Sequence, residues 1–124
     1  MERDSHLAFE ALNSMASRSA LVRLANLLWR LTIRSLGRRP TPGEVISIPL
    51  SQIDLAAATG LTPVHVSRVM RQFRERNLLT FVGHSLVVRD PRALEALSGA
   101  SETLVALWSR SVGPVGDRRE LKVY

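Results

Sequence analysis

The residue types best suited to chemistry lie on one side of residues 63–77, PVHVSRVMRQFRERN. At helical spacing this segment has an apolar stripe of Val66, Val69, Met70 and Phe73. The opposite side carries Pro63, Val64, Ser67, Arg68 and Arg71. A guanidinium group can donate paired hydrogen bonds to phosphate or to a guanine edge, and small side chains near a helix start let the helix enter a groove. The outer face therefore predicts recognition of nucleic acid, and a merely solvated charged face is the alternative.

The segment before it, residues 51–62, predicts a second helix and a tight turn. Ser51 is placed to cap this helix, with Asp54 near its positive end. Gly60 suits a left-handed turn, and Thr62 followed by Pro63 is typical of a capped helix start. The small residue Ala56 allows two helices to cross closely, and the inward side is completed by Leu55, Thr59 and Leu61. Helix, glycine turn and capped helix in this order predict a helix-turn-helix.

Short β-rich segments flank the two helices. Residues 79–82 and 86–89 predict a hairpin with Gly83, His84 and Ser85 at its turn. Residues 44–50 alternate apolar and polar side chains, and Pro49 confines this strand to an edge or to its own end. A hairpin directly after the recognition helix is typical of a wing. The expected fold is mainly α with a small β-hairpin wing: a winged helix-turn-helix preceded by a long N-terminal helix.

The N-terminal 37 residues predict a long helix that becomes strongly apolar from Leu21 onward. The apolar side chains of such a helix must be buried on several sides. The domain itself could bury some of them, and a second copy of the chain could bury the rest. The residues expected at a dimer interface are Leu7, Leu12, Met15, Val22 and Trp29. After the hairpin, residues 91–98 and 101–110 predict two short helices. Leu104, Leu107 and Trp108 are expected on one side of the last helix. Together with Trp29 they are candidates for a protein interface, although a place in the ordinary core is the favoured alternative for all four.

Composition narrows the class of protein. The chain has 124 residues, 45% of them hydrophobic, which suffices for one small core. Its net charge is +6, and Lys122 is the single lysine among 17 basic residues. The arginine bias fits a nucleic-acid partner and equally a GC-rich genome. The chain contains no cysteine, and its three histidines are scattered, so neither disulfides nor a metal site are expected. No catalytic motif, signal peptide or membrane-spanning run is evident, and we expect a cytoplasmic protein that is not an enzyme.

Residues 18–31, RSALVRLANLLWRL, and residues 46–97 resemble the C-terminal DNA-binding half of Crp/Fnr-type bacterial transcription regulators. The most specific motifs are PLSQ, LAAATGLT and VHVSRVM within residues 49–70. The resemblance implies a dimer on a palindromic operator. It aligns Thr62, Pro63, Val64, Ser67 and Arg68 with DNA-contacting positions, with Arg68 reading a guanine. Val64 and Pro63 depart from well-known members, which carry Glu and a basic residue there, so a different operator is expected.

The expected contacts divide into two groups. The base-reading residues are Pro63, Val64, Ser67, Arg68 and Arg71. The residues expected at the DNA backbone are Ser51, Thr62, His65, Gln72, Arg74, His84 and Ser85. Expected partners are double-stranded DNA, a second copy of the chain and RNA polymerase, with no membrane and no cofactor.

The expected organisation comprises four segments: the end of a dimerisation helix at 1–17, the DNA-binding domain at 18–99, a C-terminal helix at 100–112 and a tail at 113–124. The N-terminal sensor of the resembling family does not fit upstream of Arg18. The sequence is either a domain cut from a longer regulator or a natural chain that lacks the sensor. In both cases we expect that this chain does not bind a cyclic nucleotide. The rival function is a winged-helix module that contacts protein, or a fragment that does not bind DNA alone.

Overall fold

A computed structural model describes the backbone of residues 2–110 and the side chains of residues 19–110. Over these residues the order of elements is α1 (Glu2–Leu36), β1 (Val45–Ser47), α2 (Gln52–Thr59), α3 (Pro63–Glu75), β2 (Leu79–Val82), β3 (Ser85–Val88), α4 (Pro91–Ser98) and α5 (Glu102–Arg110). The fold is mostly helical with one small antiparallel sheet, which confirms the predicted winged helix-turn-helix with its long N-terminal helix.

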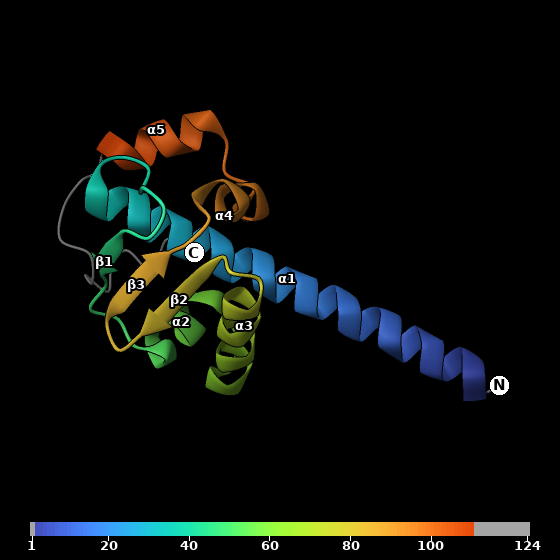
Figure 1. Ribbon diagram of the computed structural model, residues 1–124. Helices are drawn as coiled ribbons and strands as arrows, with labels where there is room; N and C mark the ends of the chain where they lie inside the picture. Colours follow the sequence, from blue (N-terminus) through green and yellow to red (C-terminus); the bar gives the residue numbers. More distant parts are fainter. Residues whose placement is uncertain (1, 111–124) are drawn as a thin grey trace.

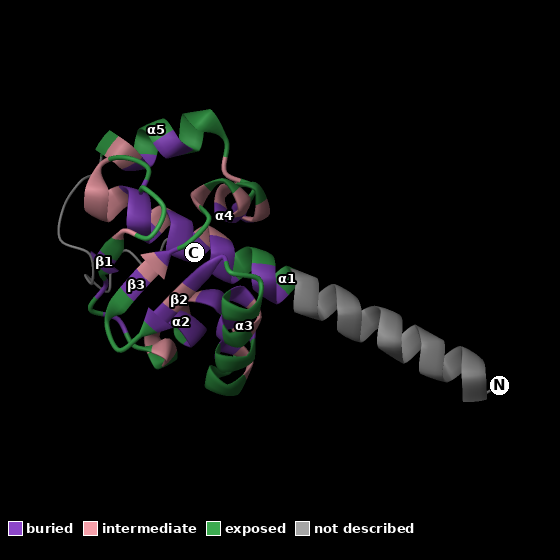
Figure 2. Ribbon diagram, in the orientation of Figure 1, coloured by how far each residue is buried: buried purple, intermediate pink, exposed green. Residues whose placement is uncertain are grey.

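The C-terminal half of α1 runs through the centre of the domain, where α2, α3, α4 and α5 all pack against it (Figure 1). From Leu24 to Ile33, every side chain except those of Asn26 and Arg30 is buried (Figure 2). This domain therefore covers the apolar helix on all sides at this level, and a second copy of the chain is not needed there. The N-terminal part of α1 extends beyond the other elements.

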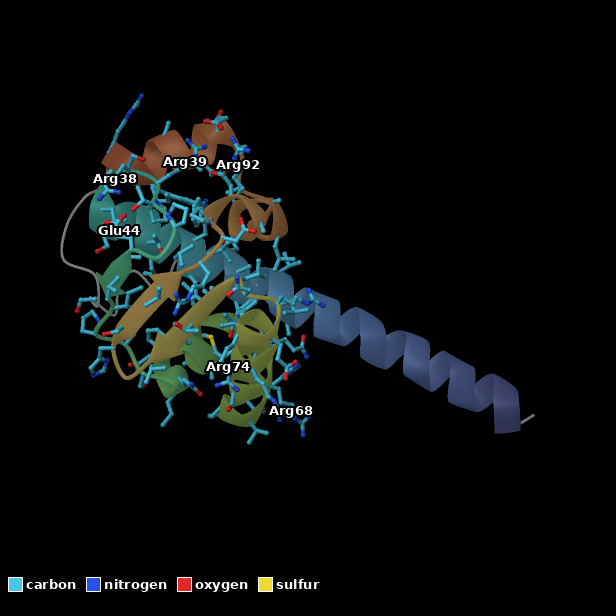
Figure 3. The ribbon with its side chains drawn as sticks, in the orientation of Figure 1. Arg38, Arg39, Glu44, Arg68, Arg74 and Arg92 are labelled. Carbon is cyan, nitrogen blue, oxygen red and sulfur yellow. The ribbon has the colours of Figure 1, made fainter. Side chains whose placement is uncertain are left out.

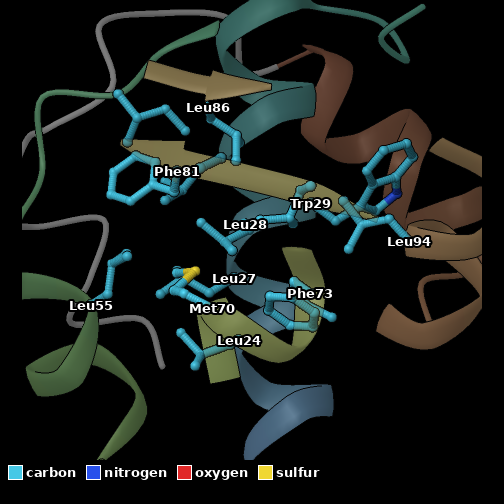
Figure 4. Packing of buried hydrophobic residues seen from close by; sticks show 14 of the residues in the cluster. Leu24, Leu27, Leu28, Trp29, Leu55, Met70, Phe73, Phe81, Leu86 and Leu94 are labelled. Atoms are coloured by element: carbon cyan, nitrogen blue, oxygen red, sulfur yellow. The ribbon is translucent and has the colours of Figure 1, made fainter. Parts of the chain in front are cut away.

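Aliphatic and aromatic side chains from every layer meet around this central helix. In Figure 4, Leu24, Leu27 and Leu28 of α1 lie beside residues of α2, α3 and the strands. The residues of the other elements that are buried in the same cluster as these leucines include Leu55, Met70, Phe73, Phe81 and Leu86. The close packing fixes α3 against the domain through its apolar stripe and leaves its other side in solvent.

Trp29 corrects one sequence prediction. Its side chain is 0% exposed and lies beside Leu94 of α4, so it belongs to the domain core and not to a dimer surface (Figure 4). The last helix shows a related difference. Val105 and Trp108 are its buried residues, whereas Leu104 and Leu107 are exposed, so Leu104 and Leu107 do not share the buried side of Trp108.

The sheet has the order β1-β3-β2 with both pairs antiparallel. The hairpin register places Phe81 opposite Leu86 and Val82 opposite Ser85, so Gly83 and His84 alone form the turn. Ser85 thus begins β3 instead of belonging to the turn as expected. β1 is shorter than predicted because its ladder ends after Ser47, although the backbone N–H of Ile48 still donates to the carbonyl oxygen of His84 at 2.8 Å.

Candidate nucleic-acid interface

The helix-turn-helix begins at a capping box. The Ser51 hydroxyl accepts from the backbone N–H of Asp54 at 3.2 Å, and the Asp54 carboxylate accepts from the backbone N–H of Ser51 at 3.0 Å. These reciprocal bonds satisfy donors that the first turn of a helix leaves free, which stabilises the short helix α2. At the other end Gly60 has φ +72°, the left-handed conformation that ends α2 and turns the chain toward α3.

Helix α3 begins as its sequence indicates. Thr62 is extended, and its hydroxyl accepts from the backbone N–H of His65 at 3.1 Å, with Pro63 in the first turn. The buried side consists of Val66, Val69, Met70 and Phe73. All of the expected base-reading residues are exposed on the remaining surface of the helix: Pro63, Val64, Ser67, Arg68 and Arg71. The structure therefore brings together on one accessible helix face the residues that the sequence singled out.

The arginines of α3 differ in what they already bind. Arg71 donates from Nε to Glu75 Oε1 at 3.1 Å, an exposed pair one helical turn apart. The side chains of Arg68 and Arg74 form no ion pair or hydrogen bond with another described residue, and both project from the outer side of α3 (Figure 3). Their guanidinium donors are thus available to an external acceptor.

A groove of about 270 Å³ separates α3 from strand β2. Its α3 wall includes Ser67, Arg68, Arg71 and Arg74, and the facing wall is formed by residues 80–82 with Gln52 at the start of α2. Gln52 and Thr80 were not predicted as site residues. Thr80 could have been predicted from the sequence, because it alternates with the buried residues of its strand. For Gln52 the sequence offers only its position next to the N-cap residue Ser51. Cationic donors on the α3 wall and the neutral donors Gln52 and Thr80 on the facing wall make this groove suited to phosphate oxygens.

Of the predicted backbone-contacting residues, only Arg74 lines this groove. Ser51, Thr62, His84 and Ser85 are exposed, and His65 and Gln72 are half-buried. Neither His65 nor Gln72 lines the groove between α3 and β2. Among the described residues there is no cluster of three or more acidic or histidine side chains that could hold a metal ion.

The predicted dimer residues fall into three cases. Leu7, Leu12 and Met15 lie outside the residues whose side chains are described. Val22 is 42% exposed, as a contact with a second chain requires, and Trp29 is excluded by its burial. Within the described part of the chain, the helices offer no stretch with the length and apolar character that a bilayer crossing needs.

Arginines at the far side of the domain are engaged internally. Arg38 donates to Glu44 at 2.7 Å and 3.0 Å, and Arg39 donates to Glu95 at 2.8 Å and to Glu102 at 2.7 Å. Hydrogen bonds from Arg38, and then from the backbone of Thr41, lower the pKa of Glu44 to about 2. The Arg39 pKa is raised by its bonds to Glu102 and Glu95. These groups fasten the loop after α1 and are not free for a ligand.

A helix-turn-helix with an adjoining wing, an exposed arginine face and a groove between the two defines the class of winged DNA-binding domains. Residues 22–97 match the family model of the Crp-like helix-turn-helix domain, and the chain belongs to this family of DNA-binding transcription regulators.

Solved structures of CprK, a Crp/Fnr regulator, are similar to this chain. A cysteine-to-serine variant of CprK complexed with OCPA is 29% identical, with a TM-score of 0.57, over 75% of this chain and 44% of that one. Reduced CprK in absence of any ligand is 25% identical, with a TM-score of 0.54, over 76% of this chain and 46% of that one. This chain thus spans less than half the length of those two proteins. No curated protein matches it.

Proposed function

We propose that this chain is a sequence-specific regulator of transcription that inserts α3 into the major groove of double-stranded DNA. The observation that carries the proposal is the exposed outer face of α3, where Arg68 has free donors one turn into the helix. A bidentate contact from Arg68 to a guanine edge, with Val64 packed on a thymine methyl, supplies base discrimination. Pro63, Ser67 and Arg71 complete the base-reading surface.

The backbone contacts extend the same surface. Arg74 and Gln52 hold a phosphate group in the groove between α3 and β2, and His84 and Ser85 present the wing to the neighbouring phosphates. Ser51, Thr62 and His65 add contacts around the two helix starts, and Gln72 adds one near the end of α3. Such contacts fix the register of the helix on the duplex, whereas the base edges determine the sequence.

The proposal includes a homodimer on a palindromic operator. The projecting part of α1 supplies the pairing segment, through Leu7, Leu12 and Met15, with Val22 at its edge, while residues 18–99 form the DNA-binding domain. Membership of the Crp-like family supports this arrangement. Contact with RNA polymerase and action in a bacterial cytoplasm belong to the same proposal.

Selection from a random duplex pool at two salt concentrations tests the function. We expect enrichment of an inverted repeat whose half-sites are about one helical turn apart, because a two-fold dimer places its recognition helices at that separation. The matched control is Arg68→Ala, which keeps the fold but loses the base contact. Salt-dependent binding without enrichment would reduce the function to nonspecific attraction. An absence of binding at low salt would favour the module that contacts protein.

A further inference from the structure

Two polar residues of α1, one helical turn apart, bind the C-terminal ends of two other helices. Arg23 donates from Nη1 to the carbonyl oxygen of Thr59, the last residue of α2, at 2.8 Å. Asn26 donates from Nδ2 to the carbonyl oxygen of Ser98, the last residue of α4, at 3.1 Å. Carbonyl groups in the last turn lack partners within the helix, and a cation there is favoured by the helix dipole. Each bond therefore ties α1 to a specific point of the domain.

Arg23 is itself held in place on α1. Its Nε and Nη2 donate to the hydroxyl of Ser19 at 3.3 Å and 3.2 Å. The Nη1 atom lies against the turn, 3.8 Å from where a Cβ at Gly60 would be. The guanidinium group thus links one turn of α1 directly to the turn that leads into α3.

The packing around this link is open. A pocket of about 360 Å³ that is open to solvent lies at the junction of α1, α2 and α4, lined by Val22, Arg23, Asn26, Ala58, Thr59 and Ser98. Apolar contacts are non-directional, whereas a hydrogen bond is directional, so at this solvent-exposed edge the bond from Arg23 sets a specific geometry. From Leu24 onward the buried core holds α1 against the helix-turn-helix, so Arg23 acts on the direction in which the part of α1 before Leu24 leaves the domain.

We propose that Arg23 is a positioning residue that fixes this direction and thereby sets the half-site separation that the dimer accepts. The inference rests on the proposed dimeric operator binding. Because the projecting part of α1 carries the pairing segment, a rotation at residue 23 moves α3 relative to the two-fold axis. Asn26 anchors α4, which does not carry the recognition helix, so Arg23 has the larger effect on half-site separation.

Binding to duplexes with altered spacing tests the role. Affinities are measured for an isolated half-site and for inverted repeats of that half-site with one or two base pairs added or removed. The variants are Arg23→Met, which keeps the aliphatic chain without the donors, and Arg23→Lys, which keeps a donor for the Thr59 carbonyl. Arg92→Met on α4 removes the same charge from an exposed position and serves as the control. Thermal unfolding verifies that each variant is folded.

For Arg23→Met we expect the preference for the best spacing to fall roughly 5-fold, about the net contribution of one ordinary hydrogen bond because Arg23 is exposed to solvent, with unchanged affinity for the half-site. Arg23→Lys restores most of the preference, and Arg92→Met keeps all of it. An equal loss on the half-site and on every repeat would make Arg23 a general structural residue and overturn the inference. A preserved preference in Arg23→Met would do the same while leaving the proposed function intact. A wild-type chain without any spacing preference would overturn both dimeric operator recognition and this inference.

Discussion

Two arginine-bearing surfaces of this domain differ in what their side chains already bind. On α3, Arg68 and Arg74 point to solvent without a described partner, and at the other end of the molecule Arg38 and Arg39 are bonded to Glu44, Glu95 and Glu102 (Figure 3). The same residue type is therefore offered to a ligand in one place and used to fasten loops in the other. The number of arginines in a chain does not locate a nucleic-acid surface, because an arginine held by carboxylates from other elements, such as Arg39, has fewer donors left for phosphate or bases.

The largest effect is expected at Arg68, and it separates the two surfaces most sharply. Arg68→Ala should cost about 1–3 kcal/mol on the preferred operator and relax the preference at one base pair per half-site, since a bidentate guanine contact is lost. Competition binding against operators substituted at each position measures this. Equal weakening on every sequence would mean that Arg68 contacts phosphate only.

Arg39 tests the opposite surface. Arg39→Met should lower the free energy of unfolding by about 0.4–2 kcal/mol, because two exposed ion pairs to α4 and α5 are removed together. DNA affinity should stay at the wild-type value. Chemical denaturation and operator binding on the same preparation measure both quantities. A loss of DNA affinity with unchanged stability would place Arg39 in the interface and break the comparison.

Arg74 sharpens the description of the groove. Arg74→Ala should weaken binding by a similar factor on all sequences and reduce the slope of log affinity against log salt by about 0.9, as for one lost phosphate contact. The control is Arg92→Ala, an exposed arginine of α4 that should leave the slope unchanged. The same reduction in both variants would show that overall charge, and not the groove, governs the salt dependence.

The smallest effect concerns Glu44. Its pKa of about 2 lies below the value near 4.3 of an unfolded glutamate, so its bonds to Arg38 and Thr41 contribute stability above pH ~4. This contribution is lost as the pH falls toward 2. Glu44→Gln should therefore have a lower melting temperature than the wild type at pH 7, and the two should converge between pH 4 and 2. A difference that is independent of pH would show that the charge of Glu44 is not responsible.

The elements that the sequence predicted well are those governed by local chemistry. The helix-turn-helix could be derived from the spacing of three residues: the N-caps Ser51 and Thr62 and the left-handed Gly60. Each of them determines where a helix begins or ends through bonds to residues only a few positions away. The exposed side of α3 followed from helical periodicity in the same way.

The remaining features depend on contacts that are distant in sequence. Trp29 is buried because α4 and α5 return to cover α1, and Arg39 meets Glu95 and Glu102 across 56 and 63 residues. Gln52 and Thr80 share a groove only after α2 and β2 are placed on α3. In α5, the pair Leu104 and Leu107 and the pair Val105 and Trp108 have the same spacing, so periodicity could not decide which pair is buried.

Strand β1 has a consequence for the protein in a crowded solution. It is an edge strand, and the outer edge of a sheet is a template on which strands of other molecules can add. Here β1 pairs over only three residues, Val45–Ser47, and Pro49 just beyond it has no N–H to offer. The addition of a strand from another molecule at this edge is therefore disfavoured. The domain can expose the apolar side chain of Val45 without offering a long edge strand for aggregation.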